Sequence, residues 1–284
     1  ASRLLEAKTD SGVSLLLLDC PAFFQRTGTA YLDADGIDFT DNHLRFGLLS
    51  KTAALLSCAA SPLRWRPDVL HCNDWPCGMA PAYLHFMDGA KAATVMSIHN
   101  LAFQGIFPAD TLIPLGLPPE AYAMDGIEYW GKLSFMKAGL HYADRITTVS
   151  PRYAEEIQTE AFGYGFAGLL RWRRADLAGI LNGIDTGEWD PATDPHLPAH
   201  FHVDDLAGKA LVKASVQAEL GLPVDPAAPL LVTVGRLDPQ KGVDLLLDSV
   251  PWLVSEGVQV AVQGTGEPAL EAAYQERFGK TPVF

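Results

Sequence analysis

Short apolar runs alternate along the chain with segments in which apolar residues recur every three or four positions. Short runs are typical of buried strands, and the three-to-four spacing is typical of helices with one apolar face. Their alternation predicts βαβ units built around a parallel sheet, that is, an α/β fold. The runs that predict strands are residues 15–18, 69–72, 94–98, 146–149, 179–181, 230–234 and 259–262.

Three helices are predicted between these strands. One continues from Leu133 towards Tyr142. The next opens at Ser150-Pro151, because serine can cap the free backbone N–H groups and proline loses no hydrogen bond in a first helical turn. The third has an apolar face made of Val243, Leu246, Leu247, Val250, Leu253 and Val254.

The character of the chain changes after Asn182-Gly183-Ile184-Asp185. About forty residues rich in Pro, Asp and His follow, without a strong strand pattern, and a new strand–loop–helix–strand series begins at Leu230. This change predicts a hinge between two Rossmann-like domains, residues 1–184 and 185–284, with the second domain incomplete.

Composition limits the classes of partner. Of the 284 residues 48% are hydrophobic and 19% charged, which is typical of a globular protein. The formal net charge of −13 argues against a nucleic-acid partner. It does not exclude an anionic ligand, because a few cations can reverse the potential locally. No apolar run reaches the roughly 18 residues that a membrane span needs, so no membrane association is expected.

Cysteine and histidine spacing indicates neither a disulfide framework nor a metal site. Cys20, Cys58, Cys72 and Cys77 form no C-x-x-C pair and are interpreted as free thiols of a cytoplasmic protein. His196, His200 and His202 have a spacing that metal ligands can have. They lie in a surface-like stretch without a cysteine partner, so we expect no metal and no cofactor.

The segment 230–242 carries the clearest chemistry of the second half. An apolar strand ends in Gly235, the following loop carries Arg236 and Lys241, and a helix begins near Gly242. Ligands of open α/β sheets bind beyond the carboxyl ends of the strands. Two cations beside the N–H groups of a helix start suit a diphosphate. The spacing alone equally allows two solvated surface cations.

Gly264-Thr265-Gly266 follows the next strand and falls at the same end of the sheet. Two glycines there allow a backbone to approach a ligand closely, although the same pattern also occurs in simple turns. The position of this segment at the sheet end supports ligand binding more strongly than the glycine pattern itself does.

In the first half, polar and aromatic residues end two neighbouring strands. The segment His71-Cys72-Asn73-Asp74-Trp75 ends one strand and the segment 97–101 ends the next. Trp75 can stack on a sugar ring and Asp74 can accept hydrogen bonds from hydroxyls. Taken alone, Trp75 also suits a core or rim aromatic and His99 a structural histidine. Asn182 follows a third strand, at the predicted hinge.

Five motifs, in this order along the chain, resemble bacterial glycogen synthases and plant starch synthases. They are Asp74-Trp75, HNLAFQG at 99–105, TVSPRYA at 148–154, ILNGID at 180–185 and GRLDPQKG at 235–242. The resemblance implies the GT-B fold, in which two Rossmann-like domains face each other across a cleft. It also implies transfer of glucose from ADP-glucose to the non-reducing end of an α-1,4-glucan, with retained anomeric configuration and without a metal.

The resemblance further implies roles for single residues. The first domain lies on the acceptor side and the second binds the nucleotide-sugar. The expected catalytic residues are His99, Arg236 and Lys241. The expected donor-binding residues are Asn100, Asn182, Arg236, Gln240, Lys241, Gly264 and Gly266. The expected acceptor-binding residues are Tyr31, Asp74 and Trp75.

The sequence also departs from the family pattern. The family's N-terminal Lys-x-Gly-Gly loop and its C-terminal Glu-Pro-Cys-Gly region have no counterpart, so we expect a chain cut at both ends and inactive alone. Pro76 stands where several members carry His, and Phe103 where Tyr is common. Two alternatives stay open: another GT-B glycosyltransferase with a different donor or acceptor, and a non-catalytic glucan- or nucleotide-binding remnant.

Overall fold

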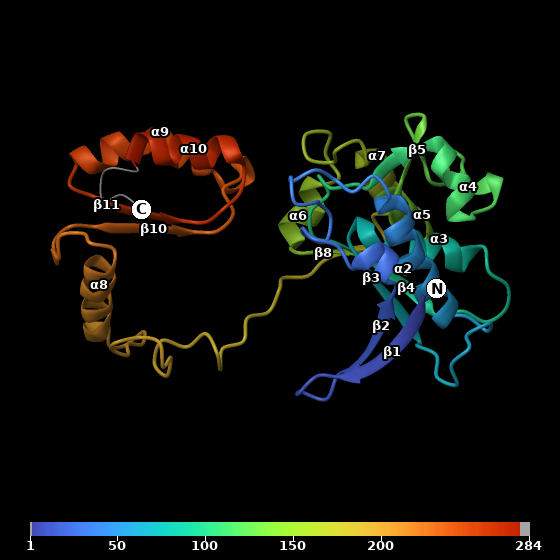
Figure 1. Ribbon diagram of the computed structural model, residues 1–284, viewed down its shortest axis with the longest axis horizontal. Coiled ribbons are helices and arrows are strands. Elements are labelled where there is room, and N and C mark those ends of the chain that lie inside the picture. The colour runs from blue at the N-terminus through green and yellow to red at the C-terminus, as the bar shows by residue number, and fades with distance from the viewer. Residues whose placement is uncertain (1, 279–284) are drawn as a thin grey trace. The chain divides into compact units, whose positions relative to one another are not determined.

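The computed structural model describes residues 2–278, and the chain forms two compact units, Ala1–Asn182 and Gly183–Phe284 (Figure 1). In the first unit the strands are β1 (Arg3–Lys8), β2 (Ser14–Asp19), β3 (Val69–Asn73), β4 (Ala93–Ile98), β5 (Ile106–Pro108), β6 (Glu128–Tyr129), β7 (Lys132–Ser134), β8 (Arg145–Thr148) and β9 (Leu177–Gly179). Its α-helices are α1 (Pro21–Phe24), α2 (Asn42–Leu56), α3 (Met79–His85), α4 (Leu112–Leu115), α5 (Phe135–Tyr142), α6 (Pro151–Glu156) and α7 (Ala167–Trp172). Its 3-10 helices are η1 (Trp75–Cys77), η2 (Ala109–Thr111) and η3 (Pro119–Ala121).

A four-stranded parallel sheet in the order β3-β4-β8-β9 forms the centre of the first unit. The strand predicted at 179–181 is wrong by two residues, because β9 is Leu177–Gly179. The pairing of β9 with β8 begins before the apolar residues 179–181. The Ile146 N–H of β8 already donates to the carbonyl of Asp176, which directly precedes β9 (2.9 Å). All four strands end at one edge, which we call the carboxyl edge.

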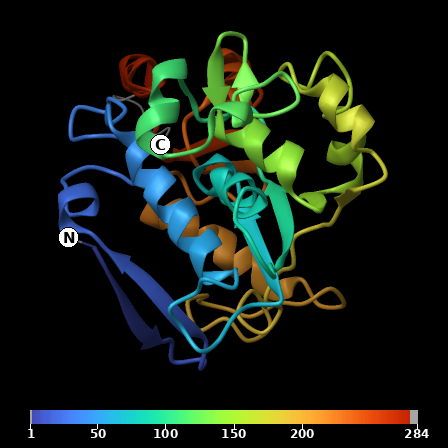
Figure 2. The ribbon, with the colours of Figure 1, turned by 90° about the vertical axis from the view of Figure 1, so that its right-hand side faces the viewer.

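Helices α3 and α5 cover one face of this sheet. Met96 and Ile98 of β4 and Ile146 of β8 are fully buried there, in one apolar cluster with Met136 and Leu140 of α5. A Cβ at Gly139 would lie 2.6 Å from the Met96 sulfur, so helix and strand pack more closely than a larger residue allows. The longer helix α2 packs beside α3 (Figure 2).

The strand predicted at 15–18 exists, but it does not belong to the parallel sheet. β2 pairs with β1 in an antiparallel hairpin, and the sequence pattern did not predict β1. The turn requires Gly12, whose φ of 87° lies in the left-handed region, and its N–H donates to the Thr9 carbonyl (2.9 Å). An apolar run gives no information on its partner, so the predicted parallel pairing is wrong for this strand.

Two serines start helices of the first unit. The Ser150 hydroxyl accepts the Tyr153 N–H (2.9 Å) at the start of α6, which confirms the predicted cap. The Ser134 hydroxyl accepts the Lys137 N–H (3.1 Å) at the start of α5, one residue after the predicted helix segment begins.

The second unit contains a two-stranded parallel sheet of β10 and β11. Its elements are α8 (Ala207–Glu219), β10 (Leu230–Val234), η4 (Pro239–Lys241), α9 (Val243–Ser255), β11 (Gln259–Gln263) and α10 (Pro268–Phe278). Val243, Leu247 and Val250 are the buried residues of α9. Val254 is 45% exposed, so the predicted apolar face extends one residue too far. The sequence pattern did not predict α8, which lies in the polar stretch that follows the predicted hinge.

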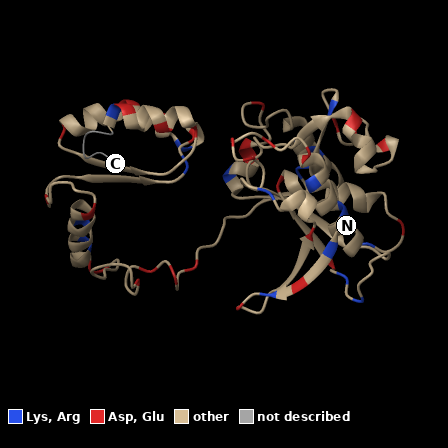
Figure 3. Cartoon of the chain, viewed as in Figure 1, with Lys and Arg blue, Asp and Glu red and all other residues tan. Residues whose placement is uncertain are grey.

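Charged side chains occur on both units, and acidic residues recur along the segment between Asn182 and α8 (Figure 3). Within residues 2–278, no helix has both the length and the apolar character needed to cross a bilayer.

Candidate active site

Asp74 organises the carboxyl edge of the first unit. It follows β3 with φ 56° and ψ −177°, a conformation that is costly for a residue with a side chain. Its N–H donates to the Ser97 carbonyl (2.9 Å) on the neighbouring strand. One carboxylate oxygen, Oδ1, accepts the N–H of His99 (2.8 Å) and, at 3.4 Å, that of Asn100. The strained aspartate therefore fixes the backbone from which the His99 side chain projects.

The His99 imidazole is exposed, and its ring contacts a side chain of the neighbouring strand. Its Nε2 lies 3.0 Å from Oδ1 of Asn73, the last residue of β3. Asn73 was not among the predicted site residues, although it directly precedes Asp74 in the chain. Asn100 accepts the Ala102 N–H on its Oδ1 (3.0 Å), which shapes the turn after His99.

The three predicted acceptor residues lie together beside this edge. The ring centroids of Tyr31 and Trp75 are 5.8 Å apart, and Asp74 precedes Trp75 in the chain. Burial, followed by the charges of Asp74 and Cys77, raises the pKa of the Tyr31 phenol.

Trp75 has a large packing role. Its ring packs against three phenylalanine rings. The centroid-to-centroid distances are 4.8 Å to Phe46, 5.9 Å to Phe107 and 6.1 Å to Phe135. A Cβ at Gly105 would lie 2.3 Å from the Trp75 ring, so the backbone at the end of the 99–105 loop packs directly against this ring. These contacts support the core or rim interpretation of Trp75 that the sequence left open.

Three further residues of the first unit were singled out from the sequence, and they differ in burial. Asn182 is exposed and is the final residue of this unit. Pro76 is buried, and its carbonyl accepts the Ser50 hydroxyl (3.2 Å). Phe103 is 48% exposed.

In the second unit, Arg236 and Lys241 lie on the loop between β10 and α9. Both are exposed, and among the described residues neither forms an ion pair. Asp238 shapes the loop by accepting the Gln240 N–H on its carboxylate (2.8 Å). Gly242, with φ 69°, turns the chain into α9. Two cations are thus presented at the start of a helix, an arrangement that attracts an anion.

Gly264 and Gly266 lie against the backbone of the same loop. A Cβ at Gly264 would come within 1.8 Å of the Gly235 carbonyl oxygen, and one at Gly266 within 2.1 Å of the Leu237 carbonyl oxygen. The Leu237 N–H donates to the Thr265 carbonyl (3.0 Å). This close contact between two chain segments accounts for both glycines, and a donor-binding role for them stays a prediction.

No group of His, Cys, Asp and Glu in residues 2–278 is arranged to hold a metal ion. The His200 Nε2 lies 3.0 Å from the Asp194 carbonyl oxygen. All four cysteines are free thiols, and Cys77 alone among them is not fully buried.

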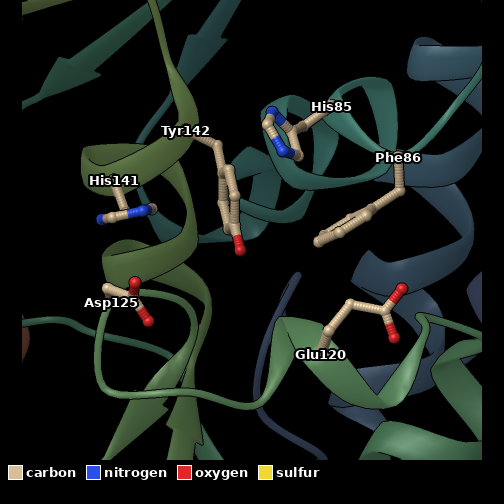
Figure 4. A pocket seen from close by; sticks show the side chains of 6 residues that line it. All are labelled: His85, Phe86, Glu120, Asp125, His141 and Tyr142. Atoms are coloured by element: carbon tan, nitrogen blue, oxygen red, sulfur yellow. The ribbon is translucent and has the colours of Figure 1, made fainter.

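A separate hollow of about 400 Å³ lies at the C-terminal ends of α3 and α5. Figure 4 shows its six side chains, His85, Phe86, Glu120, Asp125, His141 and Tyr142. β4 and β8 begin shortly after these helix ends, so the hollow lies towards the amino ends of the strands, away from His99. Burial lowers the pKa of His141, and the positive charges of Lys137 and Arg173 lower it further, whereas Asp125 opposes them.

Comparison with known proteins adds to this geometry. Residues 2–172 match the family described as the starch synthase catalytic domain. A glycogen synthase of Aromatoleum aromaticum is 55% identical over 99% of this chain, and one of Paramagnetospirillum magneticum is 58% identical over 96%. The chain spans 57% and 56% of the lengths of these two relatives.

A solved structure is also similar. It is the catalytic domain of starch synthase IV from Arabidopsis thaliana bound to ADP and acarbose, with a TM-score of 0.82 and 28% identity. The similarity covers 99% of this chain and 58% of that one. The predicted fold class, α/β of the GT-B type, is confirmed.

Proposed function

The chain belongs to the starch synthase catalytic-domain family, which includes bacterial glycogen synthases, and from this premise we propose that it contributes to a glycogen synthase reaction. The reaction transfers glucose from ADP-glucose to the non-reducing end of an α-1,4-glucan and retains the anomeric configuration. The first unit binds the glucan acceptor and the second binds the nucleotide-sugar. The free state of all four cysteines supports a location in the reducing cytoplasm.

The observation that carries this proposal is the set of contacts at Asp74. The carboxylate accepts the N–H groups of His99 and Asn100, and Asn73 holds the imidazole of His99. A histidine held at its backbone and at one ring nitrogen keeps a fixed direction, as a group that orients a sugar hydroxyl must. This arrangement, rather than the presence of a histidine alone, supports a donor-glucose role for His99.

The proposed chemistry breaks the bond between C1 of the donor glucose and the terminal phosphate oxygen. A bond forms between C1 and the 4-hydroxyl oxygen of the acceptor on the same face, and the hydroxyl proton passes to the departing phosphate. Negative charge grows on ADP as it leaves. Arg236 and Lys241, both exposed at the start of α9, stabilise that charge, and Gln240 belongs to the same loop.

The test is glucose incorporation into glycogen from labelled ADP-glucose. Because the chain spans 57% of the Aromatoleum aromaticum relative, it is assayed after joining it to that relative's flanking segments. We expect transfer from ADP-glucose well above transfer from UDP-glucose. A preference for UDP-glucose would contradict the proposed donor, and absence of transfer from both donors would contradict the proposed function.

The 284-residue chain alone, assayed in parallel, is expected to transfer no glucose. The family's Lys-x-Gly-Gly and Glu-Pro-Cys-Gly motifs are missing from its sequence, and we propose that both contribute to the reaction. Turnover by the chain alone, at a rate similar to that of the joined protein, would contradict this proposal.

A further inference from the structure

The loop between α6 and α7 contains an unusual tyrosine. Tyr164 has φ 46°, in the left-handed region that is unfavourable for a residue with a side chain. Among the described residues, three other than glycine have a φ in this region: Asp74, Trp130 and Tyr164. Asp74 already belongs to the candidate site, so the position of Tyr164 is of interest.

Contacts to the backbone hold Tyr164 in this conformation. Its carbonyl oxygen accepts two hydrogen bonds, from the hydroxyl of Tyr129 (2.8 Å) and from Nε2 of Gln104 (2.8 Å). The following Gly165 has φ 86°, and a Cβ there would lie 2.3 Å from the Tyr129 hydroxyl. These interactions do not involve the Tyr164 side chain, which therefore is not needed to close the loop.

The same contacts bring Tyr164 to the carboxyl edge. Gln104 belongs to the 99–105 loop that carries His99. Further along this loop the Leu101 N–H donates to the Tyr153 hydroxyl (3.1 Å). Burial raises the pKa of the Tyr153 phenol, the Leu101 N–H lowers it, and both Tyr164 and Asp74 raise it further. Tyr164 and Tyr153 thus both contact the loop that carries His99, Tyr164 through Gln104 and Tyr153 through Leu101.

We propose that Tyr164 is an acceptor-side residue that contacts the α-glucan chain. Its side chain is 49% exposed, and its backbone is bonded to Gln104 of the loop that carries His99, so the aromatic ring is available to a ligand beside that loop. Aromatic rings pack well on the apolar faces of sugars, and the phenol adds a hydrogen-bonding group. Tyr31, whose ring centroid lies 5.8 Å from that of Trp75, provides a second aromatic group beside Asp74 in the chain's candidate site. This inference rests on the proposed function, because it concerns the same acceptor site.

The experiment measures maltoheptaose binding by calorimetry, with the chain joined to the flanking segments of its relative. Tyr164→Gly removes the ring, and glycine adopts the left-handed φ without strain, so the variant should fold at least as well as the wild type. We expect the dissociation constant for maltoheptaose to rise roughly tenfold. Tyr164→Phe keeps the ring and should change it by less than about threefold.

Trp130→Gly is the matched control. Trp130 is 83% exposed, has φ 52° and lies in the turn between β6 and β7, so the substitution also removes an exposed aromatic ring and relieves a left-handed conformation. It should leave maltoheptaose binding unchanged. Affinity for ADP, measured in the same proteins, should be unchanged by all three substitutions.

The outcomes separate this inference from the proposed function. Maltoheptaose binding by the wild type together with unchanged binding by Tyr164→Gly would overturn the role of Tyr164 and leave the proposed function standing. An equal loss in Trp130→Gly would overturn it too, because the effect would not be specific to the loop. A wild type that binds ADP but no maltoheptaose would overturn both.

Discussion

At the scale of single residues, Gly264 shows how one added carbon atom can decide stability. The Cβ of an alanine would lie 1.8 Å from the Gly235 carbonyl oxygen, so either β10 or the loop after β11 must move. We expect Gly264→Ala to lower the free energy of unfolding of the second unit by about 1–3 kcal/mol, measured by urea denaturation. Gly235→Ala is the control, because a Cβ there meets no atom within 4 Å. Equal stabilities of the two variants would show that the close approach at Gly264 does not limit the stability of this unit.

His141 in the hollow of Figure 4 gives a prediction on pH. Burial lowers its pKa, Lys137, Arg173 and His85 lower it further, and Asp125 opposes them. In the unfolded chain the pKa returns to about 6.5, so the unfolded chain takes up the proton first as the pH falls. The stabilising effect of the neutral ring is therefore present above about pH 6.5 and is lost towards the lower pKa of the folded state.

We expect His141→Gln to lose less stability than the wild type between pH 7 and about pH 5, in melting temperatures measured across this range. His196→Gln is the control, because His196 is exposed in the second unit. Parallel curves for the wild type and His141→Gln would contradict the lowered pKa.

At the scale of helices and strands, Ser150 connects helix α6 to the site. Its hydroxyl caps the Tyr153 N–H, and the Tyr153 hydroxyl in turn accepts the Leu101 N–H of the loop that carries His99. We expect Ser150→Ala to cost about 1 kcal/mol of stability in urea denaturation. Ser150→Asp keeps an accepting oxygen and should recover most of the loss. A loss of the same size in both variants would argue against capping as the cause.

The same elements show which parts of the fold local sequence can predict. Helices α6 and α9 were predicted because a cap and an apolar spacing are local signals. Strand β1 was missed because its evidence is its partner β2, which the chain reaches only after a turn. Helix α8 was missed because it begins within a polar stretch. Its buried Gln217, which donates to the Asp225 carbonyl (3.0 Å), gives no apolar signal.

At the scale of the whole molecule, the α/β fold predicted from the sequence is confirmed, whereas the roles of the site residues stay predictions. Asp74 and His99 could be proposed because both follow strands whose carboxyl ends meet at one edge. Asn73 was missed although it ends β3, because nothing in the local sequence shows that its side chain meets the His99 imidazole, and the contact of Tyr164 with Gln104 joins residues 60 positions apart on loops. No periodic pattern encodes such contacts, so the predictable part of the site is the part that follows strand ends.

The net charge of −13 bears on the proposed binding of an anionic donor. Salt screens charges more than about 10 Å apart at 0.1 M, so the distant acidic residues matter less than Arg236 and Lys241 for a diphosphate bound against the loop. We therefore expect ADP affinity of the joined protein to fall as salt rises.

Lys241→Met should weaken ADP binding at low salt by about tenfold or more and flatten this dependence on salt. Lys209→Met changes the net charge equally but alters a lysine of α8 that packs over Phe201 (4.8 Å), so it should leave both the affinity and the salt dependence unchanged. Equal effects of the two substitutions, measured by calorimetry from about 50 to 500 mM KCl, would mean that overall charge rather than the loop governs donor binding.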